Sequence, residues 1–164
     1  ISSKQPLQAK LLDFFSNHFA VSRANLPMTL LAPTLEIEAI APNLSASFAD
    51  MLTAVTAHPA MLLYLNNERS MGPNSRHGNN RTTTKRPGGA GLNENLAREI
   101  MELHTLGVDS GYSQTDVTEF ARAITGWSIG NPRRKETPGF LFRENMHEPG
   151  QRTILGKTYK ASAK

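Results

Sequence analysis

Residues 92–107, which read LNENLAREIMELHTLG, place ionisable side chains at helical spacing. Glu94, Arg98 and Glu102 follow one another at intervals of four residues, so a helix puts them on one side as a ladder of alternating charge. Each such pair stabilises an exposed helix by ~0.3 kcal/mol, which is a sufficient structural explanation. In a catalytic interpretation, Arg98 would instead orient an anion or a carboxylate.

The opposite side of the same helix is apolar and carries two further ionisable groups. At 100° per residue Leu96, Leu103 and His104 fall on this side, and Glu99 lies at its border. Partial burial shifts pKa values, so in a catalytic interpretation Glu99 or Glu102 would be a base or metal ligand and His104 an acid–base group or ligand. A lone histidine on an apolar face is more often a hydrogen-bonded core residue, which keeps the structural interpretation open.

Histidine and carboxylate side chains elsewhere extend these candidates into two hypothetical sites. The catalytic candidates are Glu99, His104, Arg98 and His147, the last of which opens an HEPG turn. The metal-ligand candidates are His18, Glu99, Glu102 and His104. A divalent metal suits such ligands, but no HExxH spacing is present, so the site requires tertiary convergence. The sequence also lacks a G-x-S-x-G nucleophile elbow and a phosphate-binding loop with its Lys and Ser or Thr.

Composition limits the class of protein. The chain has 164 residues, a formal net charge of +4 and no cysteine, which excludes disulfides and thiolate metal sites. It contains no apolar run long enough to span a membrane, and its first residues, ISSKQPLQAK, lack the apolar centre of a signal peptide. Because it begins at Ile1 without Met and ends in ASAK, we expect a fragment of a longer chain, with residues 1–164 folded as one helical domain.

Apolar spacing predicts a mainly α protein, an irregular multi-helix bundle. The predicted helices cover residues 6–20, 26–43 (one or two short helices interrupted by prolines), 43–57 with a cap at Asn43 or Ser45, 60–65, 92–106 and 113–125. β-type residues on both sides of the HEPG turn, from Gly139 to Tyr159, predict a small β-hairpin near the C-terminus.

A long basic loop is predicted at about residues 68–92, where Gly, Asn, Arg and Pro replace apolar residues. Five basic residues and no acid lie there between Arg69 and Gly91: Arg69, Arg76, Arg81, Lys85 and Arg86. Such side chains contact phosphates, but single-strand binding usually adds aromatic rings, and the loop has none. A solvated surface loop is therefore favoured over a nucleic-acid interface.

Four segments together resemble a known bacterial family, the domain-of-unknown-function 1800 family (DUF1800). They are FFSNHFAVS (14–22), HPAMLLYLNNERSMGPNS (58–75), GLNENLAREIMELHTLGVDSGYSQTDVTEFARAITGW (91–127) and FRENMHEPGQRTILGKTY (142–159). The resemblance implies a largely helical fold, a periplasmic, envelope or secreted location, and a co-encoded secreted sulfatase-like protein as a partner. Family members are longer than this chain, which agrees with the expected fragment.

Two departures from the family pattern bear on the candidate sites. The family often has a second histidine two residues before the position of His18, where this chain has Ser16, so a His-x-His metal pair is incomplete here. At three positions that tend to be basic in the family, this chain has Ile37, Ala41 and Asn43. These replacements argue against an anionic ligand in that segment.

Two functional hypotheses follow from these residues. The first is an exported hydrolase that uses metal-assisted or acid–base chemistry on an envelope or extracellular substrate. The second is a non-catalytic helical module that binds a partner protein or an envelope polymer, with the charge ladder holding its helices together. Neither hypothesis specifies a substrate or an oligomeric state.

Overall fold

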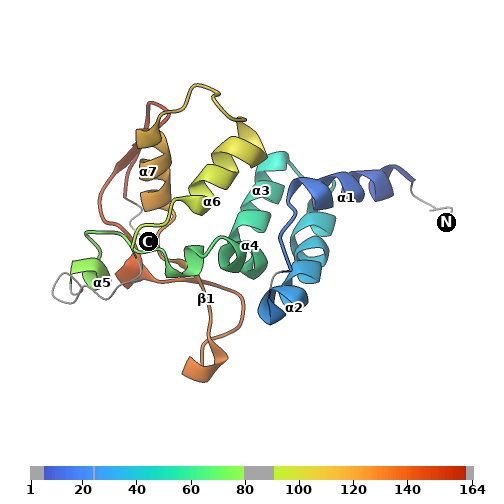
Figure 1. Ribbon diagram of the computed structural model, residues 1–164, viewed down its shortest axis with the longest axis horizontal. Coiled ribbons are helices and arrows are strands. Elements are labelled where there is room, and N and C mark those ends of the chain that lie inside the picture. Colours follow the sequence, from blue (N-terminus) through green and yellow to red (C-terminus); the bar gives the residue numbers. More distant parts are fainter. Residues whose placement is uncertain (1–5, 24, 80–90, 162–164) are drawn as a thin grey trace. The chain divides into compact units, whose positions relative to one another are not determined.

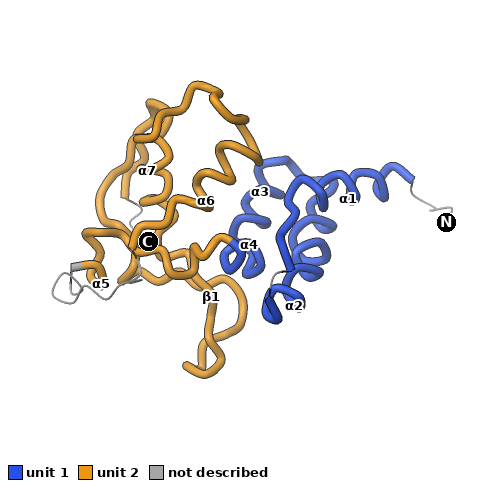
Figure 2. Tube along the Cα trace, in the orientation of Figure 1, with its two compact units in different colours: residues 1–64 blue, residues 65–164 orange. Residues whose placement is uncertain are grey.

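The computed structural model describes residues 6–23, 25–79 and 91–161. The chain divides into two compact units, unit 1 (Ile1–Tyr64) and unit 2 (Leu65–Lys164), which have different colours in Figure 2. The single domain expected from the sequence stays a prediction. Among the described residues, no helix is long and apolar enough to cross a membrane.

Unit 1 is built from helices joined by short turns (Figure 1). Its α-helices are α1 (Pro6–His18), α2 (Leu26–Leu35), α3 (Phe48–Ala57) and α4 (Pro59–Tyr64). A π-helical segment (Glu36–Ile40) and a 3-10 turn (Ala41–Asn43) continue α2. The buried apolar side chains of this unit are Phe19, Met28, Leu35, Ala39, Ile40, Met51, Val55, Ala60, Met61 and Leu62.

Helix α3 begins later than the sequence suggested. Its cap is Ser47, whose Oγ accepts the N–H of Asp50 at 3.1 Å while the Ser47 N–H donates to the Asp50 carboxylate at 3.3 Å. This reciprocal capping box satisfies two backbone donors and requires an acid three residues after the cap. Asn43 and Ser45 have no such partner at that spacing, so the predicted cap positions were wrong.

His58 joins α3 to α4. Its Nδ1 accepts the N–H of Ala60 at 3.1 Å, and its Nε2 lies 3.1 Å from a carboxylate oxygen of Glu38. Because Nδ1 accepts, Nε2 carries the proton and donates to Glu38 in the neutral ring. The sequence predicted only that His58 and Pro59 stop a helix, whereas this imidazole also satisfies a donor at the start of the next one.

Unit 2 combines helices with two small antiparallel sheets (Figure 1). Its α-helices are α5 (Arg76–Asn79), α6 (Asn95–Arg98) and α7 (Gln114–Ala123), and a π-helical segment (Glu99–Thr105) continues α6. Its strands are β1 (Trp127–Ile129), β2 (Phe140–Phe142), β3 (Arg152–Ile154) and β4 (Lys157–Tyr159). Short 3-10 turns lie at Asn67–Arg69, Pro132–Arg134 and Glu144–Met146.

Helix α7 organises one part of unit 2. Ser113 and Asp116 form its capping box, at the position that the sequence predicted. The other Asp116 carboxylate oxygen accepts the N–H of Leu155 at 2.7 Å and so ties the β3–β4 turn to the start of α7. The buried side of α7 carries Val117 and Ala121. The other buried apolar side chains of this unit are Leu65, Met71, Leu96, Ala97, Ile100, Met101 and Ile124.

The mainly α prediction is confirmed, but two finer predictions need correction. The expected loop at 68–92 contains helical turns at Asn67–Arg69 and α5, and its residues 80–90 lie outside the described residues. The expected single hairpin is replaced by two pairings. Strand β2 pairs with β1 in the register Trp127↔Phe142, and β3 pairs with β4. The helical 3-10 turn after β2 and the HEPG turn separate β2 from β3, so the two segments never align.

A partly buried ion pair between Arg143 and Glu136 fixes the loop between β1 and β2. Arg143 donates to both Glu136 carboxylate oxygens at 3.0 and 2.8 Å, and the Asn131 N–H donates to the same carboxylate at 2.7 Å. Hydrogen bonds from Arg143 and Asn131, helped by the Arg143 charge, lower the pKa of Glu136 from 4.5 to about 2. The ionised form of Glu136 is therefore favoured by folding.

This pair predicts a defined loss of stability in acid. Because the folded-state pKa of Glu136 is lowered, its contribution is fully present above pH ~4.5 and is lost as the pH falls towards 2. We expect Glu136→Gln to reduce the acid dependence of the unfolding free energy over this range, measured by urea denaturation at several pH values. Parallel pH profiles for the two proteins would contradict the expectation.

Candidate functional site

The charge ladder of residues 92–107 is formed by two ion pairs in unit 2. Arg98 donates through Nη2 to Glu94 and through Nη1 to Glu102, each at 3.1 Å. The three side chains are 38, 28 and 25% exposed, respectively, so they are neither buried nor freely solvated. The spacing of four residues thus produces the side-chain pairs that the sequence suggested.

Two residues of α7 complete this network and were missed from the sequence. Gln114 accepts a hydrogen bond from Arg98 and donates to Glu94 at 2.9 Å, and Thr118 donates to Glu94 at 2.8 Å. The sequence feature that could have predicted them is weak, since it consists only of two polar residues four positions apart in the first half of the next helix. The network therefore connects α6 and its π-helical continuation to α7.

Glu94 is held in its ionised form by these partners. Burial alone would raise its pKa, but hydrogen bonds from Gln114, Thr118 and Arg98, with the Arg98 charge, lower the pKa below its ordinary value. Glu94 is thus an acceptor for three side chains. Proton transfer by this carboxylate at neutral pH is not favoured, because protonation would break those bonds.

Glu99 is in the opposite electrostatic situation. Burial, and after it the negative charge of Glu102, raise the pKa of Glu99. Within the described part of the chain, the Glu99 carboxylate has no ion-pair partner. It begins the π-helical segment, and backbone of this kind is rare and often found at functional sites.

His104 lies near the other end of the same π-helical segment and is 6% exposed. In a π-helix the backbone bonds join residues five apart, as when the Leu106 N–H donates to the Met101 carbonyl at 2.9 Å. Residues 99 and 104 have this separation. Around the helix axis their side chains therefore point in more similar directions than they would in an α-helix. Both candidates therefore belong to one short, unusual segment.

The backbone carbonyl of Thr125 orients the imidazole ring of His147. Its Nδ1 lies 2.8 Å from the Thr125 carbonyl oxygen, and its ring meets Phe142 edge-on at 5.2 Å between centroids. A carbonyl only accepts, so Nδ1 carries a proton and Nε2 is the basic nitrogen of the neutral ring. This is the kind of support given to catalytic and metal-binding histidines.

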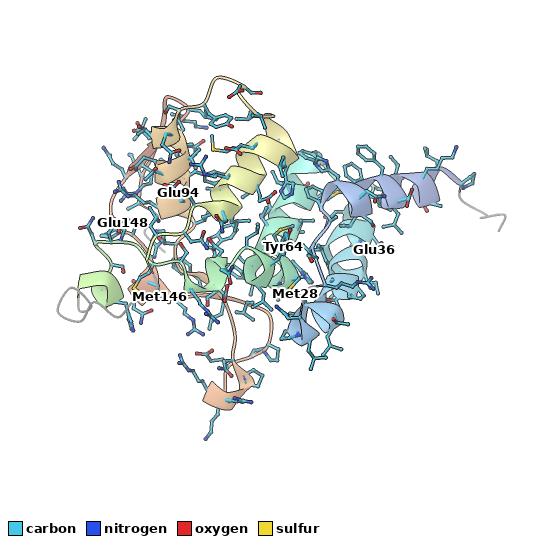
Figure 3. The ribbon with its side chains drawn as sticks, in the orientation of Figure 1. Met28, Glu36, Tyr64, Glu94, Met146 and Glu148 are labelled. Atoms are coloured by element: carbon cyan, nitrogen blue, oxygen red, sulfur yellow. The ribbon has the colours of Figure 1, made fainter. Side chains whose placement is uncertain are left out.

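Glu148 is the polar residue of this region that the sequence analysis missed. It is 2% exposed, and its carboxylate accepts the backbone N–H of Asn74 at 2.8 Å and the Asn74 side-chain amide at 2.6 Å. The Glu148 N–H donates to Thr125 Oγ at 2.8 Å. Figure 3 labels Glu148 and the nearby Met146, whose carbonyl accepts the Gly72 N–H at 2.9 Å. The sequence shows an acidic residue next to His147 in the HEPG turn. Its partner Asn74 could not be predicted, because it lies 74 positions away in the chain.

The structure brings together only part of the proposed sites. Arg98 contacts Glu94 and Glu102, and Glu99 interacts electrostatically with Glu102, whereas His147 joins Thr125 in the HEPG region. Among the described residues, no group of three or more His, Asp or Glu is placed to hold a metal ion. His18 packs against the rings of Phe14, Phe19 and Phe48 in unit 1. The metal-ligand set of His18, Glu99, Glu102 and His104 and the catalytic set of Glu99, His104, Arg98 and His147 stay predictions.

Fold and site together define a mainly helical protein in which a polar network joins a π-helical segment to its neighbouring helix. Comparison with protein families then identifies the chain: residues 1–164 match the family described as Protein of unknown function (DUF1800), and the chain belongs to that family. The resemblance noted in the sequence is thereby confirmed. No curated protein and no solved structure matches the chain.

Proposed function

We propose that this chain is a non-catalytic binding module and that its charge ladder holds the helices of unit 2 together. The observation that carries this proposal is the set of partners of Arg98. Its guanidinium donates to Glu94, Glu102 and Gln114, so it is occupied by its own protein rather than presented to a substrate. Glu148 is likewise occupied by Asn74.

Exposed apolar side chains in both units support a binding role. Leu7, Leu26, Leu30 and Ile37 are each more than 60% exposed in unit 1, and unit 2 exposes further aromatic residues. Exposed apolar side chains mark an interaction surface where they adjoin one another. A partner protein or an envelope polymer is therefore the kind of ligand that we propose.

Acid–base hydrolysis is the second candidate function, and it is favoured by the raised pKa of Glu99 and the fixed ring of His147. Such a site would use Glu99 as the proton donor or acceptor. A divalent metal would be held by His and Glu side chains and would polarise the substrate or its attacking water.

One experiment separates the two candidates. The purified protein, dialysed at neutral pH, is assayed for bound metal by elemental analysis and for hydrolysis of chromogenic carboxylate, phosphate and sulfate esters with and without added Zn²⁺. We expect no stoichiometric metal and no turnover that depends on Glu99. Turnover that Glu99→Gln abolishes at an unchanged melting temperature would overturn the binding proposal. Leu103→Gln is the matched control, because it changes an exposed side chain of the same segment.

We also propose an exported location and a co-encoded sulfatase-like partner. The support for both is the family resemblance alone. Fractionation of the native host, followed by co-purification with the tagged protein, tests them.

A further inference from the structure

One side of the β1–β2 hairpin is apolar and faces solvent. In the antiparallel register Trp127 lies opposite Phe142 and Ile129 lies opposite Phe140, so these four side chains share a side of the hairpin. Phe140 and Phe142 are 45 and 46% exposed, and Trp127 and Ile129 are half-buried. Ser128, on the other side, is buried and donates to the Glu68 carbonyl at 2.9 Å.

The loop that joins these strands carries three adjacent cations. Arg133, Arg134 and Lys135 are all exposed, and within the described part of the chain none of them is in an ion pair. Figure 1 shows this loop, with its short helical turn, extending from the end of β1 away from the other elements of unit 2. The hairpin therefore ends in three exposed positive charges, of which Arg134 also acts electrostatically on the Glu136 carboxylate.

The loop is held in a defined conformation. Asn131 caps the turn by accepting the Arg133 N–H at 2.9 Å, and the Glu136 carboxylate is clamped by Arg143 as described above. Gly130 allows the two sides of the loop to meet, because a Cβ there would lie 2.9 Å from the Thr137 carbonyl carbon. The three cations thus project from a structured support, which lowers the entropy lost on binding.

We propose that this hairpin docks on the surface of an anionic lipid bilayer, with its aromatic side at the interface and Arg133, Arg134 and Lys135 on the headgroups. This inference rests on the proposed binding function and names one partner for it. Aromatic side chains favour the membrane–water interface, and each basic residue near anionic lipid adds to the attraction. The protein would lie on the bilayer rather than span it.

The arrangement of the rings favours a bilayer over single-stranded nucleic acid. Trp127 and Phe140 meet at an interplanar angle of 90°, so they do not form a parallel platform on which successive bases stack. Ile129 lies opposite Phe140 on the same side of the hairpin and offers only apolar surface. An apolar side next to a cationic end instead matches the layers of an anionic membrane interface.

Trp127 makes the test direct, because it is the only tryptophan of the chain. Its fluorescence is measured while the protein is titrated with vesicles of phosphatidylcholine alone or of phosphatidylcholine with phosphatidylglycerol at 7:3. We expect a blue shift with the anionic vesicles only, and weaker binding as salt is raised. A single-stranded oligonucleotide serves as the competing ligand.

Charge variants locate the binding surface. We expect Arg133→Ala with Arg134→Ala to weaken binding to anionic vesicles by about thirtyfold, since two basic contacts are lost. Lys157→Ala with Lys160→Ala is the matched control, because it removes two exposed charges from β4 and its end and should have little effect. Phe140→Ser with Phe142→Ser should abolish the blue shift while circular dichroism stays unchanged.

Three results would overturn the proposal: no response to anionic vesicles, equal losses in the two charge variants, or a stronger response to the oligonucleotide than to the vesicles. None of them bears on the Glu99 assay, which tests the binding module independently. A Glu99-dependent turnover would likewise leave vesicle binding by the hairpin unaffected.

Discussion

Replacing Gly72 with alanine is expected to destabilise unit 2 by roughly 3 kcal/mol. A Cβ at this position would lie 2.6 Å from both the Cα and the Cβ of Glu148. Backbone cannot move aside as a flexible side-chain end does, and Glu148 is fixed further by Asn74 and Thr125. The added methyl group therefore separates the segment at Gly72 from the HEPG turn and weakens these hydrogen bonds together.

Urea denaturation of the two proteins, followed by circular dichroism, measures this effect. Gly91→Ala is the matched control, because a Cβ there meets no atom of the described residues within 4 Å and its φ is not in the left-handed region. We expect the control to change the unfolding free energy by less than ~0.5 kcal/mol. Equal midpoints for Gly72→Ala and the native protein would show that the contact with Glu148 is not tight.

The importance of Gly72 and Glu148 could not be predicted from the sequence. Helix caps such as Ser113 with Asp116 depend on residues three apart, and the charge ladder depends on residues four apart. Glu148 and Asn74 meet only because distant segments fold against each other. Local spacing therefore predicts the helices of unit 2 and the pairs within a helix, but not the polar contacts that join its loops.

Within the π-helical segment, helical spacing also fails to predict which side chains are buried. At 100° per residue Leu103 falls on the apolar side of its helix, yet it is 60% exposed, whereas Met101 is 3% exposed. The expected buried position of Leu103 was wrong, because backbone bonds five residues apart turn the chain less per residue than an α-helix does. His104 keeps its buried position, so the change of period moves some side chains of the segment and not others.

Arg98→Ala is the second substitution with a large expected effect, a loss of about 1.5 kcal/mol in the unfolding free energy. Each ion pair of a partly exposed arginine contributes little alone, since solvent screens it. The cost arises because one substitution leaves Glu94 and Glu102 without their shared cation and removes the hydrogen bond to Gln114. The carboxylates of Glu94 and Glu102 then lose the cation that compensated both of them.

Three comparisons show whether the network, rather than charge alone, produces this loss. Arg133→Ala removes an exposed charge of the same unit that is in no ion pair with a described residue, and it should change stability by less than ~0.5 kcal/mol. Arg98→Lys keeps the charge but replaces the planar guanidinium, which donates to three acceptors, with an ammonium group. Its unfolding free energy should therefore lie between those of Arg98→Ala and the native protein. In a double-mutant cycle, Glu94→Gln should cost clearly less in the Arg98→Ala background than alone. If the two substitutions are instead additive and Arg98→Ala melts like the native protein, Arg98 is free to serve a ligand, and the catalytic interpretation of the ladder gains the support that the present contacts deny it.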